Sequence, residues 1–171
     1  MIRHRPLVAL LTLLLAAACR RTEPPAETAK AAPPPPAEAP AVPSETGGTV
    51  TVVDAKRLKP VKTIKLGEGM RPMGTAVAPD DKSLYVTTGR SKMLLVIDTG
   101  TNAVVGSVEA GARPWGLALA ADGKTAYTAN GPSNDVAVID LETRRVTRTI
   151  PVGQGPWGAA FVQRRSTPAT R

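Results

Sequence analysis

Histidine is almost absent from this chain of 171 residues, where the only one is His4. His4 lies in a segment that we expect to be removed as a signal peptide, so the mature protein is predicted to hold no imidazole. This excludes Ser-His-Asp and Cys-His triads, His-ligated haem and His-based zinc sites. Cysteine is equally scarce, and the single Cys19 cannot form a Cys-x-x-Cys-His haem attachment. A Gly-x-x-x-x-Gly-Lys-Ser/Thr phosphate loop is also missing. We therefore predict no catalytic residues, no metal site and no cofactor.

A helical period is missing as well. Between residues 49 and 162, short runs rich in β-formers, such as 84–88, 94–97 and 104–108, are separated by turn residues. Apolar residues in these runs recur every two positions and nowhere every 3.6. This pattern predicts an all-β, antiparallel structure.

What the chain does contain is a repeat of 42 residues. Its clearest sign is a turn that occurs three times, as Arg71-Pro72-Met73-Gly74, Arg113-Pro114-Trp115-Gly116 and Gly155-Pro156-Trp157-Gly158. A fixed period of about 40–45 residues with four short strands in each copy is typical of β-propeller blades.

The strands expected from this repeat form two whole blades and a partial blade at each end. The first partial blade holds third and fourth strands at 50–53 and 61–66, and the last holds only a first strand at 159–163. The first strands carry small residues at matching positions, as expected near a crowded propeller axis. Known propellers have about four to eight blades, so this is an incomplete ring. Either the chain is a remnant of a longer gene, or copies of it complete the ring as a homo-oligomer, for which we expect a trimer.

The repeat resembles the YVTN family of β-propeller repeats, which includes YncE-like periplasmic and surface propellers. Residues 85–87 keep the start of the Tyr-Val-Thr-Asn tetrad, and Tyr127 and Asn130 keep its ends. The Pro-Trp-Gly turns and the Asp-Gly-Lys of 122–124 add to the match, which covers about 49–162. The resemblance implies the propeller fold and leaves the function open, because the motif consists of packing and turn residues.

The N-terminus reads as a targeting segment. Two arginines precede a 12-residue apolar stretch at 7–18, which is too short for a permanent membrane helix. It ends Leu-Ala-Ala-Ala before Cys19 and so resembles the lipobox of bacterial lipoproteins. We predict a signal peptide at 1–18 and lipidation of Cys19, which would anchor the protein in the bacterial cell envelope, facing the periplasm or the exterior. The alternative is an ordinary signal peptide followed by an incidental cysteine.

The segments that flank the repeats have compositions that do not form a core. Residues 19–48 hold the predicted lipidated cysteine and a tether, with eight of the 17 prolines. Residues 163–171 form a basic tail that we expect to be disordered. The net charge of the whole chain is +8, but residues 49–162 carry 14 basic and 10 acidic residues and so only +4. This excess is moderate, so a nucleic-acid partner is not expected.

The acidic residues and the tryptophans have structural interpretations. Asp54, Asp98 and Asp140 follow the third strand at one repeat position, where a carboxylate caps a turn more often than it catalyses. The same holds for Asp81 and Asp122 in the turns between first and second strands. Trp115 and Trp157 lie within the repeated turn and are predicted to pack between blades.

A cluster of cations is the one feature without a structural explanation. The turns from fourth to first strand and from second to third strand emerge at one end of a propeller, here called the rim. The rim cations are predicted to be Arg71, Arg90, Lys92 and Arg113. Arginines suit oxyanions, so this surface could bind an anionic polymer or protein, although exposed cations also serve solubility alone.

Two classes of function follow from these observations. The first is a membrane-tethered propeller that acts as a binding or scaffold module without catalysis. The second is a lactonase-like propeller enzyme, which the fold permits. A truncated, non-functional relative of a longer propeller is the third alternative.

Overall fold

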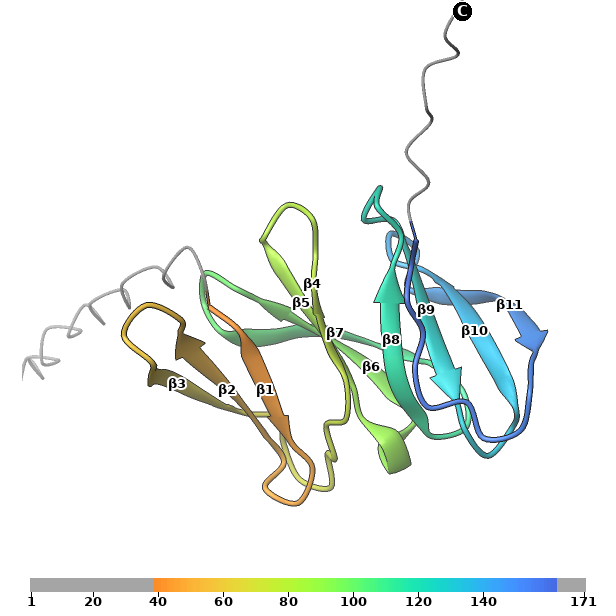
Figure 1. The fold of residues 1–171 in the computed structure, drawn as a ribbon, viewed down its shortest axis with the longest axis horizontal. Coiled ribbons are helices and arrows are strands. Elements are labelled where there is room, and N and C mark those ends of the chain that lie inside the picture. The colour runs from red at the N-terminus through yellow and green to blue at the C-terminus, as the bar shows by residue number, and fades with distance from the viewer. Residues whose placement is uncertain (1–38, 163–171) are drawn as a thin grey trace, which may run out of the picture. The chain divides into compact units, whose positions relative to one another are not determined.

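The computed structural model describes residues 39–162, and the predicted signal peptide, Cys19 and the basic tail lie outside them. Within this range eleven strands form three antiparallel sheets, joined by turns and one short 3-10 helix (Figure 1). The all-β prediction is therefore confirmed.

The first sheet has the order β1-β2-β3, with β1 at Ala41–Ser44, β2 at Thr49–Asp54 and β3 at Lys59–Lys65. The sequence predicted only β2 and β3. The tether predicted within residues 19–48 should lack regular structure, and this prediction is wrong for residues 41–44. Although this segment contains a proline, Val42 and its neighbours pair with β2 in register from Ala41↔Val52 to Ser44↔Thr49. An edge strand tolerates a proline whose missing N–H faces away from the partner strand.

The second and third sheets have four strands each, in the orders β4-β5-β6-β7 and β8-β9-β10-β11. The second comprises β4 (Thr75–Val77), β5 (Ser83–Thr87), β6 (Met93–Asp98) and β7 (Ala103–Glu109), with the 3-10 helix η1 (Gly89–Ser91) between β5 and β6. The third comprises β8 (Pro114–Leu119), β9 (Thr125–Asn130), β10 (Asp135–Asp140) and β11 (Arg145–Pro151).

The repeat is visible in backbone irregularities as well as in sequence. The pairing of the third and fourth strands shifts after Val52, Val96 and Val138, which share one repeat position. The turn that follows has a left-handed residue at one position each time, with φ of 53° at Leu58, 57° at Asn102 and 55° at Arg144. The three sheets are therefore copies of one unit, offset by 44 residues between the first and second and by 42 between the second and third.

The last predicted strand is not formed. Over residues 159–162 the chain is irregular, so the expectation of a strand at 159–163 is wrong for the described part of that range. The segment lies beside the third sheet, as the dark blue trace in Figure 1 shows, and Phe161 stacks on Tyr127 with ring centroids 6.1 Å apart. A strand is defined by its ladder of hydrogen bonds, and the second strand of a fourth unit, which would supply them, is missing from the described residues.

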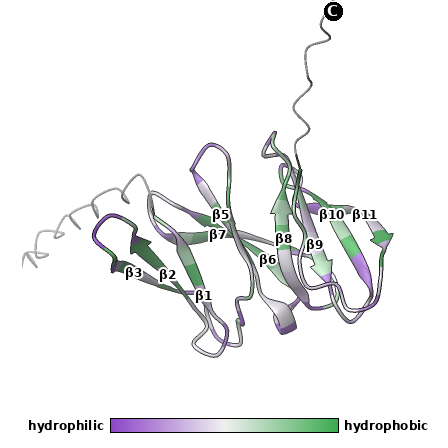
Figure 2. Ribbon diagram, in the orientation of Figure 1, coloured by the Kyte–Doolittle hydropathy of each residue, from purple (hydrophilic) through white to green (hydrophobic). Residues whose placement is uncertain are grey.

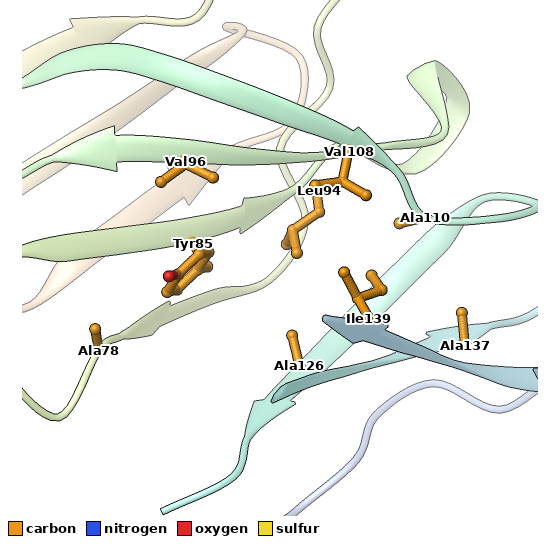
Figure 3. Packing of buried hydrophobic residues seen from close by; sticks show 9 residues of the cluster. All are labelled: Ala78, Tyr85, Leu94, Val96, Val108, Ala110, Ala126, Ala137 and Ile139. Carbon is orange, nitrogen blue, oxygen red and sulfur yellow. The ribbon is translucent and has the colours of Figure 1, made fainter. Parts of the chain in front are cut away.

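Two apolar clusters hold the sheets together face to face. In β5 and β6, Leu84, Val86, Leu95 and Ile97 face the first sheet, where Val50 and Ile64 are among the buried residues. Alternate residues of the same strands face the third sheet in the cluster drawn in Figure 3, which contains Tyr85, Leu94, Val96, Val108, Ala126 and Ile139. Each fully buried side chain of this size contributes about 1.5–3 kcal/mol. The inner strands β5 and β6 are thus mainly apolar, whereas hydrophilic residues lie in many turns and in the outer strands β3 and β11 (Figure 2).

The first strands approach one another so closely that glycine is required. A Cβ at Gly74 would lie 2.8 Å from the carbonyl oxygen of Trp115, and one at Gly116 would lie 2.7 Å from that of Trp157. Side chains are thus excluded where neighbouring first strands begin, which fits the small residues predicted along this line.

Candidate functional site

The predicted rim cations lie on turns that hydrogen bonds join to one another. Arg71 lies between β3 and β4, Arg90 in η1, Lys92 directly after η1, and Arg113 directly before β8. The Ser91 hydroxyl donates to the carbonyl of Gly69 (2.8 Å), which ties η1 to the turn that carries Arg71. The Ala110 N–H donates to the Lys92 carbonyl (2.8 Å), which ties η1 to the turn that carries Arg113. The turns therefore form one connected surface, as predicted.

Three of the four rim cations are exposed, namely Arg71, Arg90 and Lys92. The one salt bridge within residues 39–162 joins Arg57 to Asp54 (2.9 Å) and lies at the other end of the sheets. The three exposed cations thus have no carboxylate within salt-bridge distance in the described residues. The use of this surface as a binding site stays a prediction.

Arg113 differs from the other three. It is half-buried, it adopts a left-handed backbone with φ of 56°, and its guanidinium carbon lies 5.4 Å from the ring centroid of Trp115. This is cation–π distance, worth about 0.5–1 kcal/mol at an exposed site. Arg113 therefore contributes to the fold of its turn in addition to its charge.

A stacked pair of tryptophans lies beside Arg113. The rings of Trp115 and Trp157 have centroids 4.2 Å apart and planes 27° apart. Trp115 also covers Gly131, where any Cβ would overlap the indole. The predicted packing role is confirmed for Trp115. Trp157 stacks on it but stays 70% exposed, so one face of the pair is open to solvent.

A buried polar network that the sequence did not reveal holds this corner in place. Within it Asn130, fully buried, donates from Nδ2 to the carboxylate of Asp135 (2.7 Å), and Thr128 donates to the carbonyl of Ala110 (3.1 Å). These bonds fix the turn after β9 against the turn before β8. The only available signal was Asn130 itself, as the last residue of the repeat tetrad, and nothing pointed to Asp135 as its partner.

The recurring aspartates act as turn caps. Asp54 accepts from the N–H groups of Lys56 and Arg57, Asp98 from the N–H and hydroxyl of Thr101, and Asp140 from the N–H of Thr143. Backbone hydrogen bonds are the main reason that the pKa of each of these carboxyl groups lies below its usual value. The prediction of structural roles is confirmed, because each carboxylate is already bonded within its own turn.

The caps of the first turns were predicted correctly at one site and wrongly at the other. Asp122 accepts from the N–H of Lys124 (2.9 Å) as expected, but in the second sheet the acceptor is Asp80 and not Asp81. Asp81 instead takes the left-handed backbone, with φ of 58°. Asp80 is the residue 42 positions before Asp122, so strict use of the repeat would have identified it.

A small hollow of about 160 Å³ lies between these two turns, on the face opposite the rim. Asp80, Tyr85 and Asp122 contribute to its lining, and both carboxylates are the turn caps just described. No group of three or more His, Cys, Asp or Glu residues that could hold a metal ion occurs in residues 39–162.

The predicted lipidation site cannot be placed in this arrangement, since Cys19 lies outside the described residues. In the part of the chain that the structure covers, none of the helices has the length and apolar character needed to cross a membrane.

Similar architecture occurs in solved structures. The hydrazine synthase of Kuenenia stuttgartiensis is 31% identical over 67% of this chain, with a TM-score of 0.62. AztD of Citrobacter koseri, in two structures of which one is the apo form, is 21% identical over the same share, with a TM-score of 0.55. Both are β-propeller-type proteins. Residues 41–151 of this chain thus form propeller blades.

The blades match only part of those proteins, because the chain spans about a third of the length of each, 33% for the synthase and 32% for AztD. No family model matches the sequence, and no curated protein does. The propeller fold class and the incomplete ring predicted from the repeat are thus confirmed, while the similarities leave the activity open.

Proposed function

We propose that this chain is a lipid-anchored β-propeller module of the bacterial cell envelope that binds an anionic partner through its rim and catalyses no reaction. Its resemblance to the YVTN family and the lipobox-like sequence at Cys19 support the envelope location. The observation that carries the binding function is the contrast between the two kinds of charge on the blades. The recurring aspartates are bonded within their turns, whereas Arg71, Arg90 and Lys92 are exposed and have no salt bridge within residues 39–162.

The rim cations suit an extended or flat partner more than a small substrate. They project from turns at the ends of adjacent blades, and the hollow between the turns of Asp80 and Asp122 lies on the opposite face. Guanidinium groups bind carboxylate, sulfate or phosphate oxygens through parallel hydrogen bonds. The partner class is therefore an acidic polymer or an acidic protein surface.

The test compares two pairs of substitutions that remove the same charge. Arg71→Ala with Arg90→Ala removes two of the three exposed rim cations, while Lys82→Ala with Lys124→Ala removes two exposed lysines from turns at the opposite end. Arg113 is left in place because it supports Trp115. Exposed changes of this kind alter stability by within about 0.5 kcal/mol, so both variants should fold.

The readout is retention on an immobilised sulfated polysaccharide, followed by recovery of partners from envelope extract. We expect the rim variant to elute at lower salt than wild type and to recover less of an acidic partner. The lysine variant should match wild type, because exposed charges act over only about 8–10 Å at physiological salt. Equal losses in the two variants would mean that net charge and not the rim determines binding, and no loss in either would refute the proposed function.

A further inference from the structure

The first and third sheets each have one face on which no other sheet of residues 39–162 packs, whereas both faces of the second sheet are covered. In the second sheet, Tyr85, Leu94, Val96 and Val108 are buried against the third sheet. In the third sheet, the residues 42 positions later face away from the other sheets and are all half-buried or exposed, namely Tyr127, Val136, Val138 and Ile150. This surface, where Phe161 stacks on Tyr127 but no sheet of the described residues packs, is called the back face.

The front of the first sheet is the counterpart of the back face. In the second sheet, Leu84, Val86, Leu95 and Ile97 are buried against the first sheet. The positions that correspond to them in the first sheet, 44 residues earlier, lie on the front face and are half-buried or exposed, namely Pro40, Val42, Thr51 and Val53. Back-to-front packing occurs twice within the chain, and the two remaining faces are complementary in the same way.

The strands show the same complementarity. The first sheet has the equivalents of the second, third and fourth strands and no first strand, so β1 is its inner edge. Residues 159–162 follow the third copy of the repeated turn, where a first strand begins, but have no second strand beside them. In the second sheet Thr75 pairs with Val86 and Ala76 with Tyr85. By the repeat offsets, residue 159 would pair with Val42 and residue 160 with Ala41.

We propose that two copies of this chain associate head to tail into a six-bladed ring, in which residues 159–162 of each copy add the missing first strand to the first sheet of the other. The back face of each copy then packs on the front face of the other, which gives two identical contacts related by a two-fold axis. This proposal is independent of the rim and of the lipid anchor.

The number of copies follows from the number of sheets. Each chain supplies three sheets in the described residues, so two chains make six blades and three chains make nine. Propellers have about four to eight blades. The trimer expected from counting strands is therefore replaced by a dimer.

The glycine that ends each repeated turn gives the most specific evidence for a contact between two copies. A Cβ at Gly74 or at Gly116 would collide with the backbone of the next first strand, but a Cβ at Gly158 would meet nothing within 4 Å. In the ring, Gly158 would lie against Met73 and Gly74 of the second copy, as Gly116 lies against Trp157 and Gly158.

Pro43 weakens the proposed pairing between β1 of one copy and residues 159–162 of the other. The equivalent residue in the second sheet, Thr87, donates its N–H to the carbonyl of Gly74 (2.9 Å), and a proline has no such donor. The carbonyl of Ala41 already accepts from the Thr75 hydroxyl (3.0 Å), but a carbonyl oxygen can accept a second bond. The contact between copies thus has fewer hydrogen bonds than those within the chain, and we expect a reversible dimer.

The first test is the protein mass of the full chain, measured by light scattering in mild detergent at several concentrations. We expect a mass of two chains that falls toward one on dilution. A mass of one chain at every concentration up to about 100 µM, or of three chains, would overturn the proposal.

The second test uses glycine substitutions, and a disulfide checks the register. Gly158→Ala should raise the dimer dissociation constant by roughly tenfold or more and leave the thermal midpoint of the monomer unchanged, because only the contact between copies becomes overpacked. Gly100→Ala, in an exposed turn of the second sheet, is the matched control and should leave both unchanged.

In a Cys19→Ser background, a chain with Val42→Cys and a chain with Ala159→Cys should form a disulfide cross-link when mixed. A chain with Val42→Cys and a chain with Val162→Cys should not. Unchanged dimerisation of Gly158→Ala, or equal cross-linking of both cysteine pairs, would also overturn the proposal.

Discussion

The hydroxyl of Thr87 donates a hydrogen bond to the carbonyl oxygen of Trp115, at 2.7 Å, and so links the second blade to the third. The hydroxyl oxygen of Thr87 itself accepts from the N–H of Gly74 (2.9 Å). Thr87 is fully buried, and this one side chain therefore satisfies two backbone groups at the narrow inner ends of two blades. Small residues alone do not account for the close approach there, because the backbone groups that meet also need hydrogen-bond partners.

Thr87→Val should therefore destabilise the protein although valine has nearly the same shape. The change leaves the N–H of Gly74 and the carbonyl of Trp115, both on half-buried residues, without this partner, which costs about 1–3 kcal/mol. Equilibrium denaturation with urea would measure the loss. Thr147→Val is the control, since the Thr147 hydroxyl also donates to a carbonyl, that of Val138, but is exposed. If both variants lose the same free energy of unfolding, the link between blades is not important for stability.

Gly116→Ala tests the glycine requirement at the inner strands. The added methyl group would lie 2.7 Å from the carbonyl oxygen of Trp157 and must push two backbone segments apart. Overpacking of this kind costs about 1–3 kcal/mol, so we expect a lower thermal midpoint by circular dichroism. A midpoint equal to that of wild type would show that the inner strands can separate without cost.

Acid should destabilise the blades through their turn caps. The pKa values of Asp54, Asp98 and Asp140 are lowered in the folded state, so the folded protein holds these protons less tightly than the unfolded chain does. The resulting stability is fully present above the ordinary carboxyl pKa of about 3.9 and is lost as the pH falls through the lower folded values. We expect the thermal midpoint to be steady from pH 7 to about pH 5 and to decrease below about pH 4.

Variants of two of these caps test whether the caps cause the loss of stability in acid. Asp98→Asn with Asp140→Asn should flatten the decrease, because asparagine also caps turns but does not titrate in this range. Glu109→Gln, at an exposed position in β7, should retain the wild-type profile. A double variant as acid-sensitive as wild type would assign the effect to other carboxyl groups.

We predict that lipid anchoring depends on Cys19. Cys19→Ala should abolish incorporation of a labelled fatty acid and move the protein from the membrane fraction to the soluble one, because each buried lipid methylene contributes about 0.8 kcal/mol to membrane binding. Fractionation and autoradiography measure both effects. Continued sedimentation of the variant with membranes would show that the lipoprotein interpretation is wrong.

The sequence predicted the blades well because the repeat and the two-residue alternation are local and occur more than once. The strand positions in β5, β6, β9 and β10 and the capping roles of Asp98 and Asp140 follow from spacing and turn chemistry alone. The first and last units were predicted less well. The proline-rich sequence before residue 49 concealed β1, and the segment at 159–162 has the sequence of a strand but no neighbour to pair with.

The sequence predicted which turns carry the rim cations, but it predicted only partly what surrounds each of these side chains. The turns that carry Arg71, Arg90, Lys92 and Arg113 do form one connected surface. However, charge and spacing could not distinguish the exposed Arg71 from Arg113, which lies over an indole ring. That difference depends on a left-handed backbone at Arg113 and on the packing of the Trp115 indole over Gly131, both of which appear only in three dimensions.

The stacked indoles also provide an intrinsic fluorescence signal. The chain has two tryptophans, and both belong to the stack. Indole fluorescence therefore reports on one place, the contact between the third blade and the segment that follows it. Undocking of that segment would separate the rings and change the emission while most of the β-sheet signal in circular dichroism persists. Local opening at this end of the chain can thus be followed separately from global unfolding without any added label.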